Sequence, residues 1–169
     1  MPVIQLVTRI HAPISLCFDL ARDIELHIKS TKGTDERAIA GVTSGLIGVG
    51  EEVTWEATHF GVRQQLTSRI IAFDSPNHFR DSQVSGPFRR FDHDHFFHSE
   101  STGTVMRDVF DFESPFGWLG RAIDLCILRG YMKKLLEHRA EVIKATAEGF
   151  QRQRRDCKSQ TPTGDWRTK

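Results

Sequence analysis

Residues 88–113 read FRRFDHDHFFHSESTGTVMRDVFDFE, and their alternation predicts a β-hairpin. Side chains on a strand point alternately to its two faces, so the first half carries rings on one face, namely Phe91, His93, His95 and Phe97. Its other face is charged and carries Arg90, Asp92 and Asp94. After a turn at 101–103, the second half places on one face Thr104, Met106, Asp108, Phe110 and Phe112. Apolar faces that also carry titratable groups are typical of a ligand cavity rather than of a plain core.

The segments before this hairpin continue the pattern of strands joined by short turns. We predict strands over 52–60, 62–73 and 78–84, which lead into the strands over 88–100 and 104–113. Five consecutive strands with turns of a few residues predict an antiparallel meander, because parallel neighbours would need long crossovers. Further strands over 3–10 and 37–42 bring the expected sheet to six or seven strands.

Helices are expected on both sides of this strand region. Two short helices should follow the first strand, one beginning at Pro13 and one capped by Asp23. A long helix is expected from Gly117 to about Glu148, because apolar residues recur at three- and four-residue spacing, namely Trp118, Ala122, Leu125, Met132, Leu136, Ala140, Ile143 and Ala147. We expect Gly149 to end it and residues 150–169 to form a basic, disordered tail. A helix about 10 Å across is narrower than the sheet, so a cavity should remain between them.

Length and composition exclude several classes of protein. The chain has 169 residues, 38% hydrophobic and 27% charged, with a formal net charge of +1. These values fit one globular domain and give no overall basic field to attract nucleic acid. The cysteines Cys17, Cys126 and Cys157 form no CxxC motif and predict neither a disulfide framework nor a zinc knuckle. We recognise no signal peptide and no transmembrane segment, and we expect a cytoplasmic protein.

Most of the chain, from about residue 3 to residue 148, resembles a known superfamily. The similar segments are IHAPISLCFDLARDIELH at 10–27, GVGEEVTWEATHFG at 48–61, LTSRIIAFDSPNHFRDSQVSGPF at 66–88, FDHDHFFH at 91–98 and GTVMRDVFDFESPFG at 103–117. They resemble the START-like or SRPBCC superfamily, which includes birch-pollen-allergen-like and polyketide cyclase/dehydrase-like proteins, and in particular a bacterial ligand-binding subgroup. The resemblance implies an α+β helix-grip fold, in which a curved antiparallel sheet wraps around the C-terminal helix within one domain over 1–149. It does not transfer a function, because this superfamily hosts carriers, receptors and enzymes.

Candidate ligand-contacting side chains are those expected on the inner face of the sheet. The apolar candidates are Trp55, Phe91, Met106, Phe110 and Phe112. The polar candidates are His59, Asp81, Gln83, His93, His95 and Asp108. Each also has a purely structural interpretation: Trp55 is equally well a core residue, and backbone or water could satisfy Asp81 and Gln83.

Asp108 is the most informative of these candidates. An unpaired carboxylate between Met106 and Phe110 would be costly, so we expect a partner, with His93 or His95 on the adjacent strand the obvious choice. A structural ion pair is the plainer interpretation, whereas a functional pair would orient an imidazole that binds or deprotonates an enolisable carbonyl. The two histidines can also begin a metal site with Asp108 or His59 as a third ligand. Because no third ligand is recognisable, we predict no metal and no cofactor.

Three functions are compatible with this pattern. The first is binding of a small hydrophobic molecule, such as a lipid, polyketide or aromatic metabolite, with the glycine-rich segment 41–50 and the first helices gating entry. The second is a cyclase- or dehydratase-type enzyme, with His93, His95 and Asp108 as catalytic candidates. The third is a regulatory interaction module, similar to cell-division inhibitors, with a vestigial pocket. We favour the first, with no nucleic-acid partner, and the free sheet edges would allow a homodimer.

Overall fold

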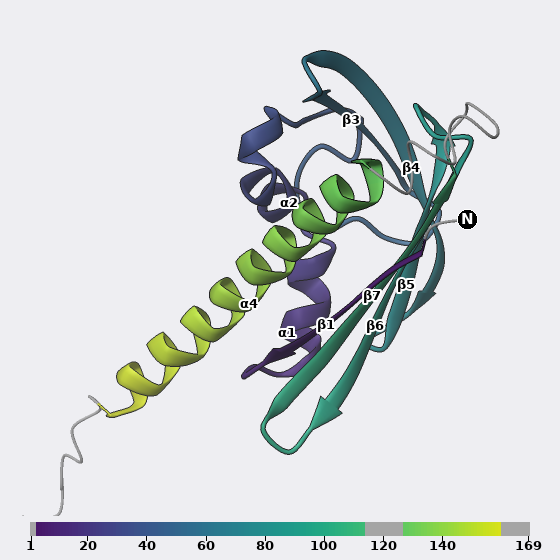
Figure 1. Ribbon diagram of the computed structural model, residues 1–169. Coiled ribbons are helices and arrows are strands. Elements are labelled where there is room, and N and C mark those ends of the chain that lie inside the picture. Colours follow the sequence, from purple (N-terminus) through teal and green to yellow (C-terminus); the bar gives the residue numbers. More distant parts are fainter. Residues whose placement is uncertain (1–2, 114–126, 160–169) are drawn as a thin grey trace, which may run out of the picture.

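Seven strands form one antiparallel sheet that curves around the helices (Figure 1). The computed structural model describes residues 3–113 and 127–159. Across the sheet the order is β1 (Val3–Ile10), β7 (Gly103–Glu113), β6 (Arg90–Glu100), β5 (His78–Ser85), β4 (Val62–Asp74), β3 (Glu52–His59) and β2 (Arg37–Gly41). Strands β3 to β7 are sequential neighbours, which confirms the predicted meander. The N-terminal strand β1 closes the sheet beside β7.

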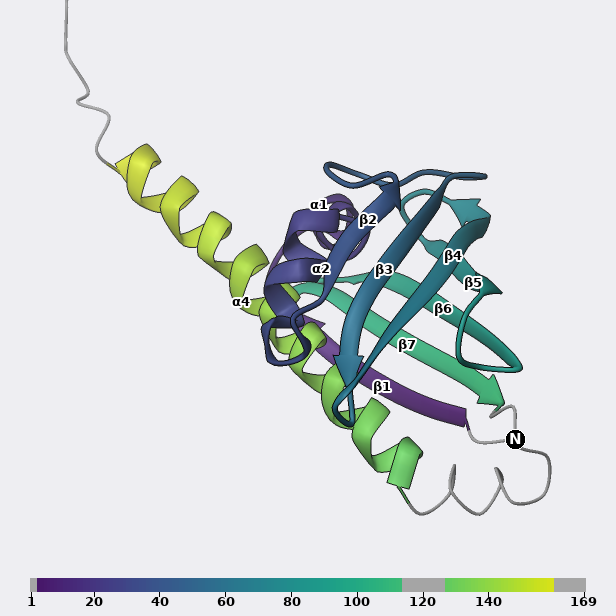
Figure 2. The same ribbon diagram turned by 90° about the horizontal axis from the view of Figure 1, so that it is seen from above.

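The helices lie on the concave side of this sheet (Figure 2). After β1 come α1 (Ile14–Ala21), α2 (Ile24–Ser30) and a short 3-10 helix, η1 (Lys32–Thr34). The Asp23 side chain accepts a hydrogen bond from the Leu26 backbone N–H at 2.7 Å and so caps α2 as predicted. The long helix α4 (Arg129–Ser159) crosses the sheet diagonally and packs along β1. Together these elements make the predicted helix-grip arrangement.

The predicted faces of β6 and β7 are confirmed. The inward-facing residues of β6 from Phe91 to Phe97 and of β7 from Thr104 to Phe112 are all buried. One outward residue departs from the expected solvent exposure: Asp94 is only 7% exposed. Its carboxylate accepts two hydrogen bonds from Arg80 at 2.7 Å and contacts His78 Nε2 at 2.8 Å. Arg80 and His78 therefore shield Asp94 on the outer face of the sheet.

The core divides into two clusters, both on the inner face of the sheet. In the first, the ring of Phe18 on α1 packs edge-on against Phe73, Phe79 and Phe97, with ring centroids 5.3–5.5 Å apart. Cys17 is fully buried beside it. Each such aromatic pair contributes about 0.5–1.5 kcal/mol beyond the area it buries. The second cluster joins Leu136 of α4 to rings of β6 and β7, namely Phe91, Phe110 and Phe112.

Helix α4 corrects the predicted end of the long helix. It continues through Gly149 to Ser159, so residues 150–159 are helical rather than disordered. A single helical glycine costs only about 1 kcal/mol relative to alanine, and the glutamine and arginine residues that follow favour helix. The buried face ends at Ala147, and Figure 1 shows the last turns projecting beyond the sheet. The predicted helix start with Trp118, Ala122, Leu125 and Cys126 lies outside the described residues, as does the tail from 160 onward.

Among the described residues, no helix is both long enough and apolar enough to cross a bilayer.

Candidate functional site

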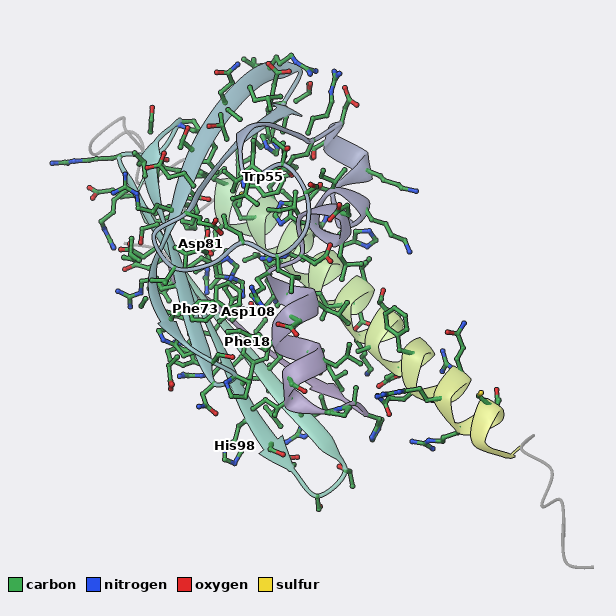
Figure 3. The ribbon with its side chains drawn as sticks, turned by 180° about the vertical axis from the view of Figure 1, so that it is seen from behind. Phe18, Trp55, Phe73, Asp81, His98 and Asp108 are labelled. Carbon is green, nitrogen blue, oxygen red and sulfur yellow. The ribbon has the colours of Figure 1, made fainter. Side chains whose placement is uncertain are left out.

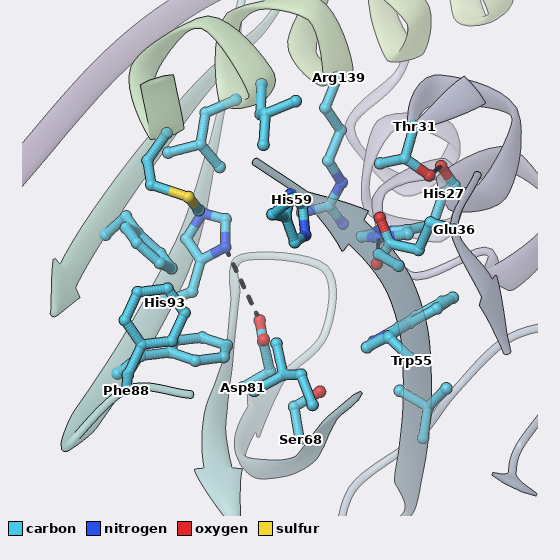
Figure 4. A pocket seen from close by; sticks show the side chains of 18 of the residues that line it. His27, Thr31, Glu36, Trp55, His59, Ser68, Asp81, Phe88, His93 and Arg139 are labelled. Atoms are coloured by element: carbon cyan, nitrogen blue, oxygen red, sulfur yellow. Dashed lines mark hydrogen bonds and ion pairs between the residues drawn. The ribbon is translucent and has the colours of Figure 1, made fainter. Parts of the chain in front are cut away.

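A cavity of about 560 Å³ lies between the inner face of the sheet, α2 and α4 (Figure 4). This volume is within the range of small-molecule sites, about 300–1,000 Å³. Most of its wall is apolar: the aromatic and aliphatic side chains include Ile24, Ile47, Val53, Trp55, Ile70, Phe79, Phe88, Phe91, Phe110, Leu128, Met132 and Leu136. The space exists because α4 packs along β1, whereas the strongly curved far half of the sheet stands away from it.

Six of the predicted ligand-contacting residues line this cavity, and five do not. Those in the wall are Trp55, His59, Asp81, Phe91, His93 and Phe110. Those outside it are Gln83, His95, Met106, Asp108 and Phe112. Met106 and Phe112 are buried in the core clusters, and His95 and Asp108 lie one layer behind the wall. Gln83 has a structural task instead, since its amide donates to the Phe88 carbonyl at 2.7 Å and accepts from the Phe88 N–H at 3.2 Å.

The register of three adjacent strands brings two histidines and two carboxylates together. On β5 and β6, Asp81 is directly opposite His93, and on β6 and β7, His95 is directly opposite Asp108. Opposite and diagonal neighbours on one face of a sheet come within side-chain reach. Figure 3 places Asp81 and Asp108 midway along the sheet, with His98 at the far end of its strand. The expected pairing of Asp108 with the histidines is thus confirmed, and Asp81 joins it from the other side.

Each imidazole of this cluster lies between the same two carboxylates. His95 Nδ1 is 2.7 Å from Asp108 Oδ1, and His95 Nε2 is 3.2 Å from Asp81 Oδ1. His93 faces them with the opposite nitrogens, because its Nε2 is 3.4 Å from Asp108 Oδ1 and its Nδ1 is 4.0 Å from Asp81 Oδ1. The nitrogens that face Asp108 approach it away from the ideal hydrogen-bond direction, so these are close polar contacts rather than well-directed hydrogen bonds.

Burial and mutual contact set the charges of this cluster. Burial by itself would raise the pKa of Asp108, but His93 and His95 outweigh it and hold that pKa well below its usual range. Burial, together with the charge of His95, lowers the pKa of His93 to about 4. Burial also disfavours a charged His95, yet Asp108 and Asp81 raise its pKa above the ordinary value. Without a bound ligand, His93 is therefore neutral at pH 7, whereas the two carboxylates favour the charged form of His95.

A second polar group lies at the α2 end of the cavity, and of its members only His59 was predicted from the sequence. The Nε2 atom of His27 is 3.3 Å from Glu36 Oε1, and the His27 ring stacks on Trp55 with centroids 4.2 Å apart. Nearby, His59 Nδ1 is 2.8 Å from the Tyr131 hydroxyl. Burial would raise the pKa of Glu36, but the charge of His27 and its hydrogen bond keep that pKa below its usual value. This end of the wall therefore carries an ionised carboxylate as well as hydrogen-bonding rings.

Arg139 extends from α4 into the cavity between these two polar groups (Figure 4). One guanidinium nitrogen, Nη2, donates to the Ala21 carbonyl at 2.6 Å. Within the described part of the chain, no carboxylate lies within 4.0 Å of the guanidinium to form an ion pair. An arginine has five N–H donors, so most of them remain available to a molecule in the cavity. Arg139 was also missed, because helical periodicity marks its position simply as polar.

The glycine-rich segment 41–50, which was expected to gate the cavity, is hydrogen-bonded to the junction of α1 and α2. The Ile24 N–H donates to the Gly45 carbonyl at 3.0 Å, and the Ile47 N–H donates to the Arg22 carbonyl at 3.2 Å. The Gly45 N–H also donates to the Glu25 carboxylate at 2.8 Å. Any opening at this side would have to move the loop and the helix junction together, or break these bonds. Gating remains a prediction.

Comparison with solved structures identifies the fold of the chain. No protein-family model and no curated protein matches the chain. Among solved structures, TTHA0849 from Thermus thermophilus has a TM-score of 0.67 at 20% identity and covers 86% of this chain and 99% of that chain. A START superfamily protein from Mycobacterium smegmatis scores 0.64 at 13% identity, covering 88% and 98%. Ginseng major latex-like protein 151 from Panax ginseng scores 0.63 at 16% identity, covering 86% and 97%. The chain therefore has the START-like helix-grip fold that its sequence resemblance implied.

Proposed function

We propose that this protein binds a small, mainly apolar molecule that carries an acidic group, such as a fatty acid or an aromatic acid. The observation that carries the proposal is the cavity of about 560 Å³ with a largely apolar wall. An apolar cavity with a few fixed polar groups is the usual form of a small-molecule site. Such a cavity also speaks against the vestigial pocket of the interaction hypothesis.

Arg139 is the reason for proposing an acid rather than a neutral lipid. A guanidinium at the wall of an apolar cavity is stabilised by a carboxylate partner, and none of the described residues places a carboxylate within 4.0 Å of Arg139. A bound carboxylate would accept hydrogen bonds from Arg139 while its chain or ring lies against Trp55 and Phe91. Burial of the apolar part contributes about 25 cal/mol per Å² removed from water.

Displacement of a fluorescent probe tests this function. The aromatic sulfonate 1-anilinonaphthalene-8-sulfonate should bind the purified protein and be displaced by dodecanoate. An Ala57→Trp variant, which places a large ring in the cavity wall, should lose both effects while unfolding cooperatively. Ile71→Trp is the matched control, because Ile71 is 53% exposed on β4 and does not line the cavity. Equal displacement in the two variants would refute the proposal, as would the absence of displacement in the unaltered protein.

The acid–base alternative rests on one specific arrangement. His93 lies in the cavity wall, and Asp108 contacts its other nitrogen from behind, which is how a carboxylate orients a general base. A bound aromatic methyl ketone, acetophenone, would then exchange its methyl protons for deuterium faster than in buffer, as followed by NMR in D₂O. A His93→Gln variant should reduce the exchange to the buffer rate. If the protein gives no acceleration at all, this alternative fails, and binding is unaffected as a proposal.

A further inference from the structure

We propose that Asp81, His93 and His95 bind one divalent transition-metal ion, for which Zn²⁺ is the test ion. One donor atom from each residue lies within 4.8 Å of the other two. The two histidines are buried, and the Asp81 side chain is 19% exposed toward the cavity. Two imidazole nitrogens and one carboxylate oxygen that lie close together are a common ligand set for zinc and for other divalent ions of the first transition-metal row. The third ligand, Asp81, was predicted at first to contact an organic ligand.

The donor spacing fits such an ion. Zinc bonds to histidine nitrogen and carboxylate oxygen are about 2.0–2.2 Å, which puts two donors on a tetrahedral ion about 3.4 Å apart. Asp81 Oδ1 is 3.2 Å from His95 Nε2 and 4.0 Å from His93 Nδ1, so the distances lie on either side of this value. Small rotations of the side chains suffice to complete the set.

Asp108 gives the strongest support, because it contacts the two histidines through the nitrogens that face away from Asp81. His95 Nδ1 and His93 Nε2 lie 2.7 Å and 3.4 Å from Asp108 Oδ1. Metal-binding histidines usually direct their second ring nitrogen to a carboxylate, which fixes the tautomer and the ring orientation. One buried carboxylate, that of Asp108, lies beside this second nitrogen in both rings. Its contacts leave Nδ1 of His93 and Nε2 of His95 as the donors for the ion.

The charges of the cluster also match a divalent cation. Two carboxylates, Asp81 and Asp108, lie against two imidazoles in a buried part of the sheet. A dication with neutral imidazoles would make this group electrically neutral, and a buried group without net charge avoids most of the cost of desolvation. The charge of Arg139 on α4 also acts on Asp81 and opposes the binding of a cation.

The site would have an open position on the side of the cavity. Asp81 and His93 both lie in the cavity wall, and three protein ligands leave a fourth position for water or for an oxygen of the bound molecule. A carboxylate ligand could then contact the ion as well as Arg139. His93 cannot hold the ion through Nδ1 and serve as the free base of the acid–base alternative at once, so that alternative applies to the metal-free protein.

Titration of chelator-treated protein with Zn²⁺ alone tests this site by isothermal titration calorimetry. We expect one equivalent to bind the unaltered protein and the His98→Gln control, whose exposed side chain is at the distant end of β6. Asp81→Asn and His93→Gln should each weaken binding by more than about 100-fold, and Asp108→Asn by about 10- to 100-fold. Unchanged binding in Asp81→Asn and His93→Gln, or no binding to the unaltered protein, would overturn the site.

A second measurement needs no variant and guards against misfolding. In ¹⁵N-labelled full-length protein, the histidine ring nitrogens report metal binding directly through their chemical shifts. On addition of Zn²⁺, Nδ1 of His93 and Nε2 of His95 should shift as metal-bound nitrogens, while the rings of His27, His59 and His98 stay unchanged. Shifts confined to other histidines would show adventitious binding at the surface and would contradict the proposed site.

Discussion

The Nδ1 atom of His95 lies 2.7 Å from Asp108 Oδ1 across the β6–β7 pair, in the interior of the sheet. Both residues are buried, at 1% and 6% exposure. A charge pair in such a place is costly to break, because removing one partner leaves the other charge buried without compensation. This pair therefore links the stability of the sheet to the polar wall of the cavity.

Replacing Asp108 with alanine should lower the free energy of unfolding by about 3–5 kcal/mol, since His95 would lose its closest anion. Urea denaturation followed by circular dichroism measures this change. His98→Ala, on the same strand but exposed, should stay within about 0.5 kcal/mol of the unaltered protein. A loss of less than about 1 kcal/mol in Asp108→Ala would mean that the pair is structurally unimportant.

The Arg139→Gln substitution should weaken the binding of acids much more than the binding of alcohols. The unaltered protein should bind dodecanoate more tightly than dodecanol, because only the acid can accept charge-assisted hydrogen bonds, each worth about 1.5–3 kcal/mol. In the variant, dodecanoate should weaken at least about tenfold while dodecanol changes little. Competition against the fluorescent probe gives both affinities. Lys134→Gln, on the exposed face of α4, is the control; equal losses for acid and alcohol would contradict an ionic role for Arg139.

Glu36 should make the fold less stable in acid. The groups around it are His27 on α2, His59 on β3 and Tyr131 on α4. Because the pKa of Glu36 is lower in the folded chain than in the unfolded chain, its contribution is complete above the unfolded value of about 4.3. It is lost as the pH falls through the folded value. The stability difference between the unaltered protein and Glu36→Gln should therefore shrink from pH 6 to pH 3 in urea titrations. A difference that grows on acidification would reverse the assignment.

Gln83→Ala should affect stability and not ligand binding. Its amide makes two hydrogen bonds to the Phe88 backbone, each worth about 0.5–1.5 kcal/mol, so we expect a total loss of about 1–3 kcal/mol. Thermal and urea unfolding measure the loss, and probe displacement by dodecanoate should give an unchanged affinity. A weaker affinity for dodecanoate in a fully folded variant would instead indicate that Gln83 contacts the ligand.

The strands were predictable because their signals are local. Alternation along 91–97 and 104–112 assigned each side chain to a face, and the turn at 101–103 set the hairpin. Gly103 illustrates the point, since it has a φ of +151° and a Cβ at this position would meet the Ile10 carbonyl oxygen at 2.1 Å. Only glycine fits there. Short-range patterns of this kind carry enough information to order a meander.

The cavity wall could be predicted only in part, because it depends on how distant elements cross. His27, Glu36, Tyr131 and Arg139 come from α2, the segment before β2, and α4, and their proximity follows from the path of the helices over the sheet. Asp81 was placed on the inner face, but its position opposite His93 depends on the β5–β6 register. The extension of α4 beyond Gly149 shows a further limit, since a weak helix breaker does not end a helix whose neighbours favour it.

Transfer of magnetisation from a bound fatty acid to the protein tests the central claim most directly. With ¹³C-labelled dodecanoate and methyl-labelled protein, we predict intermolecular nuclear Overhauser effects to Ile70 of β4 and Leu136 of α4, which both line the cavity. Methyl groups on the exterior, such as those of Val7 and Val49, should give none. Contacts confined to the exterior methyls, or no contacts at saturating dodecanoate, would contradict a ligand-binding cavity.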